Sequence, residues 1–228
     1  MQLQEVMPWG RLASEYLSLF ALTPQDMNGR ILDCAGGPSS FTAELTAQGK
    51  QVVSCDPLYQ YSVEEISARI DETYPKMLAL NEANRQNFRW EDFISPTQLG
   101  QMRMRAMRLF LDDFPDGKEK GRYVTGELPC LPFPDKSFDL ALCSHFLFTY
   151  SEHFSTEFHV ESLMEMARVA GEVRVFPLMT AFSGELSPHL PVVMEELREQ
   201  GLAVEVRQVG YEFQRGGNRM LLVSRPDR

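Results

Sequence analysis

Apolar residues follow two alternating patterns along this chain, and their alternation predicts the architecture. Longer stretches with apolar positions three and four residues apart are typical of amphipathic helices. Between them lie short, nearly continuous apolar runs, typical of strands that are buried on both faces. These short runs lie at residues 29–34, 51–55, 123–125, 138–144 and 173–176. Strands that alternate with helices predict an α/β fold built on a mostly parallel sheet.

Several helix-like stretches carry terminal signals. Ser62 followed by Glu65 is a capping-box pattern, and Ser95–Pro96 is a typical N-cap and first helical position. Pro75 is expected to kink or restart the helix that begins at Ser62. The interval between the second and third strands is longer than one crossover needs. It therefore predicts an extra helix, and we expect an insertion over residues 95–122 that covers the substrate pocket.

The remaining helices are expected from residue 12 to about Thr23–Pro24 and over residues 41–48, 156–170 and 187–201. Near the C-terminus the pattern changes to two β-rich runs, 202–213 and 219–224, joined by the sequence RGGN. A glycine-rich turn between two such runs favours an antiparallel hairpin. No linker divides the chain, so we expect a single domain over residues 1–228.

Composition narrows the classes of function. Apolar residues make up 43% and charged residues 24%, as in an ordinary globular protein, and the net charge is −10. An acidic surface repels phosphate backbones, which disfavours nucleic acid as a partner. The N-terminal sequence lacks the apolar stretch of a signal peptide, and no apolar run reaches the length of a membrane span. These features predict a cytoplasmic protein with no membrane contact.

The cysteines and histidines do not form a metal-binding pattern. No C-x-x-C pair occurs, and we expect buried free thiols in place of disulfides. His153 and Glu157 are four residues apart, but His153 precedes the expected helix, so a solvated face is the favoured interpretation. We expect no metal site. The four cysteines are Cys34, Cys55, Cys130 and Cys143.

Candidate chemistry follows the first strand, in the sequence ILDCAGGPSS of residues 31–40. A glycine-rich turn before a helix lets a ligand approach the backbone and the helix N-terminus. Asp33 stands before the glycines, where a carboxylate would oppose a pyrophosphate but attract an amine or a sulfonium. The alternative is a structural turn in which Asp33 caps backbone N–H groups.

Asp56 ends the second strand, 23 positions after Asp33. A carboxylate in this position of a nucleotide-binding sheet accepts both hydroxyls of a ribose. The alternative is an Asx turn assisted by Pro57.

Three segments together resemble a known family. ILDCAGGPSS, LPFPDKSFDLALCSHFL (residues 131–147) and MARVAGEVRVFPL (residues 166–178) are similar to the first motif, the fourth strand and the fifth strand of class I S-adenosylmethionine-dependent methyltransferases. The second segment is similar above all to the subgroup that includes the ubiquinone and menaquinone methylases. The resemblance covers about residues 29–178, and it implies a Rossmann-like methyltransferase sheet.

The resemblance also implies roles for individual residues around the cofactor S-adenosylmethionine. Asp33 would hold the methionine amine directly or through water, and Asp56, followed by Pro57, would bind the ribose. Where the family often has glycine, Ala35 is harmless if its φ angle is negative. The other implied contacts are Ala35, Gly36 and Gly37 along the cofactor, Glu127 at the adenine amino group, the backbone of Leu128 at the adenine ring, and Ser144 and His145 beneath the methyl group.

The methyl acceptor is less well marked. His145 is the candidate base if a hydroxyl or an ammonium has to lose a proton, the alternative being a structural histidine. Tyr150 could orient an acceptor or belong to the pocket wall. Arg11 and Tyr16 could meet either the cofactor carboxylate or the substrate. Another cationic group could grip an anionic acceptor or simply stay solvated; it consists of Arg103, Arg105 and Arg108.

Three functions stay open. The sequence favours an S-adenosylmethionine-dependent methyltransferase with a small-molecule acceptor. An NAD(P)-type oxidoreductase is disfavoured by Asp33 and by the terminal hairpin. A non-catalytic protein that binds S-adenosylmethionine is the third. Fold-level resemblance does not choose the acceptor, and no pattern indicates the oligomeric state.

Overall fold

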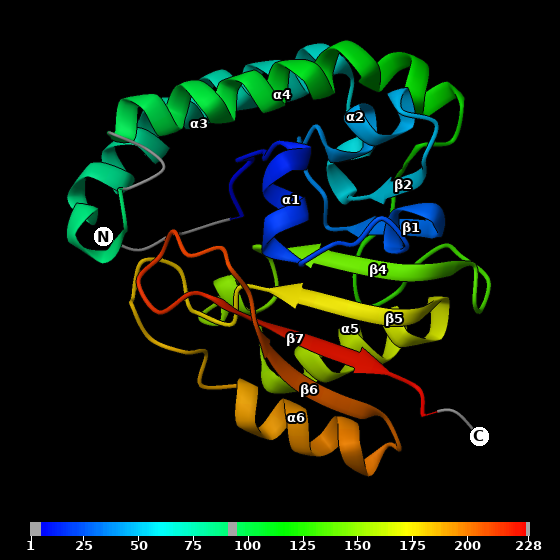
Figure 1. Cartoon of the computed structure of the whole chain (residues 1–228). Helices are drawn as coiled ribbons and strands as arrows, with labels where there is room; N and C mark the ends of the chain where they lie inside the picture. The colour runs from blue at the N-terminus through cyan, green and yellow to red at the C-terminus, as the bar shows by residue number, and fades with distance from the viewer. Residues whose placement is uncertain (1–5, 91–94, 227–228) are drawn as a thin grey trace.

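A seven-stranded sheet forms the centre of the molecule. The computed structural model describes residues 6–90 and 95–226. The strands are β1 (Arg30–Cys34), β2 (Gln51–Cys55), β3 (Tyr123–Val124), β4 (Phe138–Ser144), β5 (Ala170–Phe176), β6 (Ala203–Gln208) and β7 (Arg219–Ser224). Their order is β3-β2-β1-β4-β5-β7-β6. The first five are parallel, whereas β7 runs antiparallel to both β5 and β6 (Figure 1). The predicted parallel sheet with a C-terminal antiparallel hairpin is confirmed.

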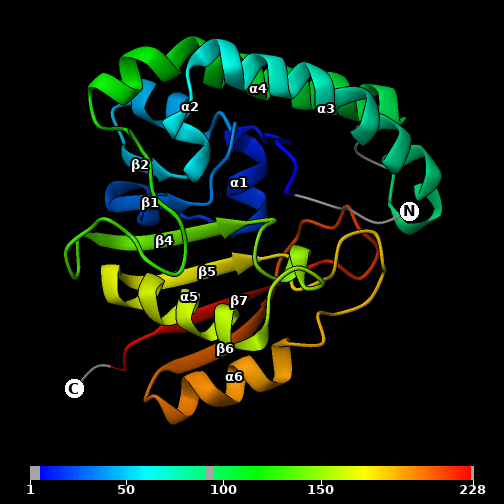
Figure 2. The same cartoon turned by 180° about the vertical axis from the view of Figure 1, so that it is seen from behind.

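Helices cover both faces of this sheet, as Figures 1 and 2 show. On one face α5 (Thr156–Val169) and α6 (Leu190–Glu199) pack on the strands, and on the other face α1 (Ala13–Leu19) and α2 (Phe41–Ala47) do so. Ile31 joins the core of α1 and α2, while its neighbour Leu32 joins the core of α5 and α6. Strands buried on both faces explain the continuous apolar runs of the sequence.

Two long helices, α3 (Val63–Ala83) and α4 (Pro96–Glu119), come between β2 and β3 in the sequence. They lie side by side and extend beyond the sheet (Figures 1 and 2). The extra helix is therefore confirmed, as are the Ser62–Glu65 capping box and the N-cap at Ser95, whose hydroxyl accepts from the Gln98 N–H at 3.2 Å. Of the two outcomes expected at Pro75, a restart is wrong, because α3 continues through this residue, whereas a kink stays a prediction. Apolar residues on both sides of Pro75 are buried, so tertiary packing outweighs the missing hydrogen bond.

Two other boundaries differ from the predictions. The last helix begins at Leu190, because the Ser187 hydroxyl accepts from Ser151 at 2.6 Å and from the His189 N–H at 3.3 Å, and so holds a separate turn. Strand β6 ends at Gln208, short of residue 213. Phe213 leaves the sheet, and its carbonyl accepts from the Arg89 N–H at 2.7 Å. The chain after β6 thereby reaches the far end of α3.

Three of the cysteines are neighbours in the sheet. Cys34 pairs in register with Cys55 of β2 and with Cys143 of β4. All three are buried free thiols, and Cys130 is exposed and also free. Within residues 6–90 and 95–226, no helix is long and apolar enough to cross a membrane, and no three acidic, histidine or cysteine side chains are placed to hold a metal ion. Residues 1–5, which entered the expectation about a signal peptide, lie outside the described residues.

Candidate functional site

A cavity of about 900 Å³ opens at the carboxyl ends of β1, β2 and β4. Its volume lies near the upper end of the range for small-molecule sites. Every predicted site residue except Asp33 lies on its wall, and Arg11 and Tyr16 lie there too. The predicted residues on the wall are Ala35, Gly36, Gly37, Asp56, Pro57, Glu127, Leu128, Ser144, His145 and Tyr150.

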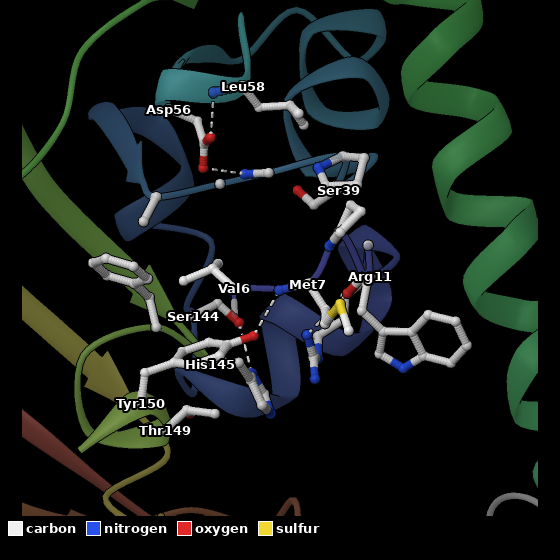
Figure 3. A pocket seen from close by; sticks show the side chains of 18 of the residues that line it. Val6, Met7, Arg11, Ser39, Asp56, Leu58, Ser144, His145, Thr149 and Tyr150 are labelled. Atoms are coloured by element: carbon white, nitrogen blue, oxygen red, sulfur yellow. Dashed lines mark hydrogen bonds between the residues drawn. The ribbon is translucent and has the colours of Figure 1, made fainter. Parts of the chain in front are cut away.

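The Asp56 side chain links the segments that follow β1 and β2 by hydrogen bonds at the cavity wall. Its Oδ2 accepts from the Gly37 N–H at 2.9 Å and its Oδ1 accepts from the Leu58 N–H at 2.7 Å (Figure 3). Burial raises the pKa of this carboxyl group to about 6. The Asx turn of the alternative interpretation is therefore present. Each oxygen of a carboxylate can accept a further hydrogen bond, so the turn leaves room for a ribose hydroxyl at either oxygen.

The glycine-rich loop has a left-handed backbone at two positions. Gly37 has φ +53°, and a Cβ atom there would meet nothing within 4 Å. Ala35 has φ +54°, so the negative angle under which it would be harmless is not found. Its N–H donates to the Cys55 carbonyl at 2.8 Å, which holds the strained residue in place. At Gly36 a Cβ would lie 2.4 Å from Oδ2 of Asp33, so only glycine fits there.

Asp33 lies behind this loop with no exposed surface. Its carboxylate accepts from three hydroxyl groups, those of Tyr16 at 3.1 Å, Ser39 at 3.3 Å and Ser54 at 3.2 Å. Burial raises the pKa of Asp33 to about 7. Tyr16 and Ser39 lie on the cavity wall, so any link from Asp33 to a ligand runs through their hydroxyls. The predicted contact with the methionine amine stays a prediction.

Sequence reasoning missed the hydroxyl groups that surround Asp33. Ser54 is its neighbour in the β1–β2 register, and the Ser54 hydroxyl also lies 2.7 Å from that of Tyr59. Tyr59 in turn donates to the Gly37 carbonyl at 2.7 Å. The strand register, once known, would have identified Ser54. Tyr59 follows β2 in a short turn and carries no signal of this contact.

Ser144 is the last residue of β4 and His145 follows it, and both lie on the cavity wall. The Ser144 hydroxyl and His145 Nδ1 are hydrogen-bonded at 2.9 Å, and the His145 N–H donates to the Phe176 carbonyl at 2.6 Å (Figure 3). Burial, and then the positive charges of Arg11 and Arg103, hold the pKa of His145 well below its ordinary value. The imidazole is therefore neutral at pH 7 and only weakly basic.

Tyr150 and the N-terminal segment close another side. The Tyr150 hydroxyl accepts from the Met7 N–H at 3.0 Å, so this side chain fixes residues 6–11 against the cavity (Figure 3). Nothing in the irregular N-terminal sequence had indicated this position. Glu127 and Leu128 lie on the wall after β3, where the Glu127 carbonyl accepts from the Cys130 N–H at 3.0 Å.

Much of the remaining wall is aromatic and comes from segments far apart in the sequence. Phe88, in the segment that follows α3, stacks on Phe213 of the loop after β6, with ring centroids 4.7 Å apart. Sequence reasoning missed these residues, because loops carry no periodic pattern. The aromatic residues on the wall other than Tyr16 are Trp9, Tyr61, Phe88, Phe146, Tyr150, Phe154, Phe158, Phe176, Phe182, Tyr211 and Phe213.

Helix α4 contributes Leu99 and Arg103 to the wall. Arg103 is only 1% exposed and forms an ion pair with Glu15 of α1. The solvated interpretation is thus wrong for Arg103, whereas Arg105 and Arg108 are exposed. The expectation that residues 95–122 cover a substrate stays a prediction.

The chain is similar in sequence to one known protein and in fold to several solved structures. It is 30% identical over 226 residues to MJ0045 of Methanocaldococcus jannaschii, an uncharacterised protein, with 99% of both chains covered. No protein-family model matches. Among solved structures, the mitomycin 7-O-methyltransferase MmcR superposes with a TM-score of 0.51 and 14% identity, over 94% of this chain and 54% of that chain. A TehB-like methyltransferase of Corynebacterium glutamicum superposes with a TM-score of 0.48 and 15% identity, over 90% of this chain and 84% of that chain. The predicted class I methyltransferase fold is confirmed.

Proposed function

We propose that this chain, which belongs to the same protein family as MJ0045 and has the class I methyltransferase fold, transfers a methyl group from S-adenosylmethionine to a small-molecule acceptor. The observation that carries the proposal is the convergence of ten predicted cofactor and acceptor residues on one cavity wall. They come from the ends of β1, β2, β3 and β4, which meet at one edge of the sheet because these strands are parallel.

The residues present fit an adenosyl amino acid. Gly37 leaves open space beside the backbone, and Asp56 offers carboxylate oxygens for ribose hydroxyls. Glu127 and Leu128 would meet the adenine ring. When bound, S-adenosylmethionine supplies an electrophilic methyl group.

The chain's own residues bind, orient and exclude water. The aromatic wall keeps the site apolar, which strengthens the polar contacts inside it. His145 and Tyr150, which lie on the cavity wall after β4, would face the acceptor. A neutral imidazole whose Nδ1 is paired with Ser144 can orient an acceptor and is a weak base for it.

The two alternatives receive less support. In dinucleotide-binding sheets the strand order is 3-2-1-4-5-6, whereas this sheet inserts an antiparallel β7 between β5 and β6. A non-catalytic binding protein would not need an apolar compartment beyond the cofactor residues, and this cavity has one.

Binding of S-adenosylhomocysteine tests the proposal. We expect thermal stabilisation by S-adenosylmethionine and S-adenosylhomocysteine but not by NAD or NADP. Asp56→Asn should weaken S-adenosylhomocysteine binding at least about tenfold in calorimetry, because an amide cannot accept from two ribose hydroxyls and two backbone N–H groups at once.

Asp71→Asn is the matched control, since Asp71 is exposed on α3 and lies off the cavity wall. Its affinity should equal that of the unmodified chain. Stabilisation by NAD and by neither adenosyl compound would refute the proposed function.

A further inference from the structure

One end of the cavity holds a guanidinium group, that of Arg11, which forms no ion pair among the described residues. Arg103 is paired with Glu15, and both side chains are buried. Arg11 lies beside them and donates to the Trp9 carbonyl at 3.2 Å. Among the described residues Arg11 forms no ion pair, and its Nε is buried without a partner. The guanidinium of Arg11 therefore adds a positive charge that no carboxylate of the described residues pairs with.

The other titratable groups at this end do not supply the missing negative charge. Burial raises the pKa of Tyr16 well above its ordinary value and that of Tyr211 to about 12, so both phenols are neutral at pH 7. His145 is neutral as well. Burial and the neighbouring Arg103 lower the pKa of Arg11 to about 10, which still leaves it charged at pH 7.

The acidic residues of the wall lie elsewhere. Asp56 and Glu127 follow β2 and β3, and Glu65 accepts from the Ser62 N–H in the capping box of α3. In Figure 3 the Asp56 carboxylate and the Arg11 side chain are well separated, with the glycine-rich loop between them. The cofactor does not remove the imbalance, because its carboxylate is accompanied by an ammonium and a sulfonium.

The surroundings of this charge are apolar. Trp9, Phe176 and Tyr211 lie on the same wall as Arg11 and His145. Charges interact more strongly where water is excluded, so an ammonium group near Arg11 would be repelled and an anion attracted. The cavity thus discriminates by charge among acceptors of similar shape.

We propose that the methyl acceptor is an apolar acid, such as a phenol, an enol or a carboxylic acid, that binds as its anion against Arg11 beside His145. This inference rests on the proposed function and names its substrate class. An acidic acceptor gives up its proton to solvent when it binds. His145 then orients the anion and has no proton to remove, which accords with its position as a neutral group.

A chromogenic phenol tests the charge preference directly. The probe is 4-nitrophenol, whose ionisation is followed by absorbance, titrated with the full chain in the presence and in the absence of saturating S-adenosylhomocysteine. We expect the pKa of the bound probe to fall by at least about 1, as for a group that gains an opposite charge nearby. 4-Nitrobenzylamine, an ammonium of similar size, should not displace it.

Three variants locate the effect. Arg11→Gln should abolish most of the fall in probe pKa, and Arg11→Lys should retain part of it. Arg105→Gln, at an exposed position of α4, should retain all of it. A bound probe with unchanged pKa, a full effect in Arg11→Gln, displacement by the amine, or no probe binding would each overturn the inference. Loss of S-adenosylhomocysteine binding alone would instead refute the proposed function, because the probe titration is also made without it.

Discussion

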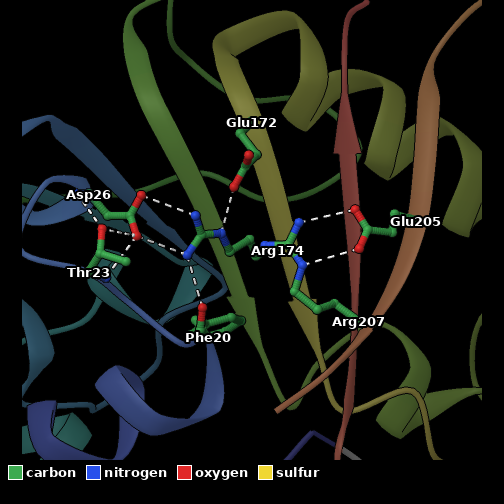
Figure 4. Close-up of polar contacts among 7 residues, drawn as sticks. All are labelled: Phe20, Thr23, Asp26, Glu172, Arg174, Glu205 and Arg207. Carbon is green, nitrogen blue, oxygen red and sulfur yellow. Dashed lines mark hydrogen bonds and ion pairs between the residues drawn. The ribbon is translucent and has the colours of Figure 1, made fainter.

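Two buried arginines of this chain lie in contrasting surroundings. Arg174 of β5 is 7% exposed, and its guanidinium faces two carboxylates, Asp26 at 3.1 Å and Glu172 at 2.6 Å (Figure 4). It also donates to the Phe20 carbonyl at 2.9 Å. Arg103 at the cavity is even more buried and pairs with Glu15, and a second guanidinium, that of Arg11, lies beside this pair without an ion pair of its own among the described residues.

The difference separates a structural charge from one that awaits a ligand. Around Arg174 every charge has a partner within the chain, and the contacts tie the turn at Asp26 to the centre of the sheet. Around Arg11 the balance is incomplete, because its guanidinium forms no ion pair among the described residues. A buried charge without a partner costs free energy, so its persistence is best explained by a partner that arrives with the substrate.

The largest expected effect follows from removing the carboxylate of Glu15. Glu15→Gln should lower the free energy of unfolding by about 4 kcal/mol in urea at pH 7, because the buried Arg103 would lose its ion pair with Glu15 while Arg11 stays charged beside it. Glu64→Gln, on the exposed side of α3, is the control and should change stability by less than about 0.5 kcal/mol. A loss below 1 kcal/mol for Glu15→Gln would mean that water already reaches Arg103.

The Arg174 cluster should respond more weakly, and without any effect on ligands. Arg174→Gln is expected to cost about 2–3 kcal/mol, since Asp26 and Glu172 are partly exposed and water can replace part of the contact. S-adenosylhomocysteine affinity and the pKa of bound 4-nitrophenol should be unchanged in the folded variant. A shift in either would show that the two arginines are coupled through the sheet, and the comparison would fail.

Asp33 is the opposite case to the buried arginines. It is a buried carboxylate whose side-chain hydrogen bonds all come from hydroxyl groups and none from a cation. Its pKa is raised to about 7 by burial, whereas an unfolded aspartate ionises near pH 4. Between these values the folded chain holds a proton that the unfolded chain has lost. The contribution of Asp33 to stability is therefore present below about pH 4 and is lost as the pH rises through about 7.

Asp33→Asn should remove this dependence. The variant is expected to gain stability relative to the unmodified chain as the pH rises from 4 to 7, and to be more stable by about 2 kcal/mol at pH 8, after allowance for poorer hydrogen bonding of the amide. Urea unfolding of both chains across this range measures the difference. A difference that stays constant with pH would show that Asp33 is already ionised within the folded chain.

The fold was predictable from the sequence because its signals are local. Buried parallel strands leave continuous apolar runs, and the capping box at Ser62 marks a helix start. The restart predicted at Pro75 as one of two outcomes did not occur, and packing along α3, which outweighs the missing hydrogen bond, is not visible in a single helix pattern. The glycine-rich loop and Asp56 were found for the same local reason, since both follow strands directly.

The charge balance of the site could not be predicted. Glu15 and Arg103 are 88 positions apart and meet only because the fold brings this part of α4 to α1, and the spacing of the arginines on α4 does not say which one turns inward. The left-handed backbone at Ala35 was likewise hidden, since alanine gives no signal of a positive φ. Contacts between distant segments decide both features.

The smallest effect on stability is expected where the effect on ligands is largest. Arg11→Gln should change the free energy of unfolding by less than about 1 kcal/mol, because relief of the repulsion from Arg103 offsets the lost contact with the Trp9 carbonyl.

Stabilisation by benzoate should distinguish Arg11→Gln from the unmodified chain. At ten times its dissociation constant an anion that binds the folded state stabilises it by about 1.4 kcal/mol, and the unmodified chain should show this gain while Arg11→Gln should not. Arg174→Gln, though far less stable, should keep the full gain, since its missing charge never faced a ligand. Equal stabilisation of all three chains would place the anion elsewhere and leave the excess charge at Arg11 without its partner.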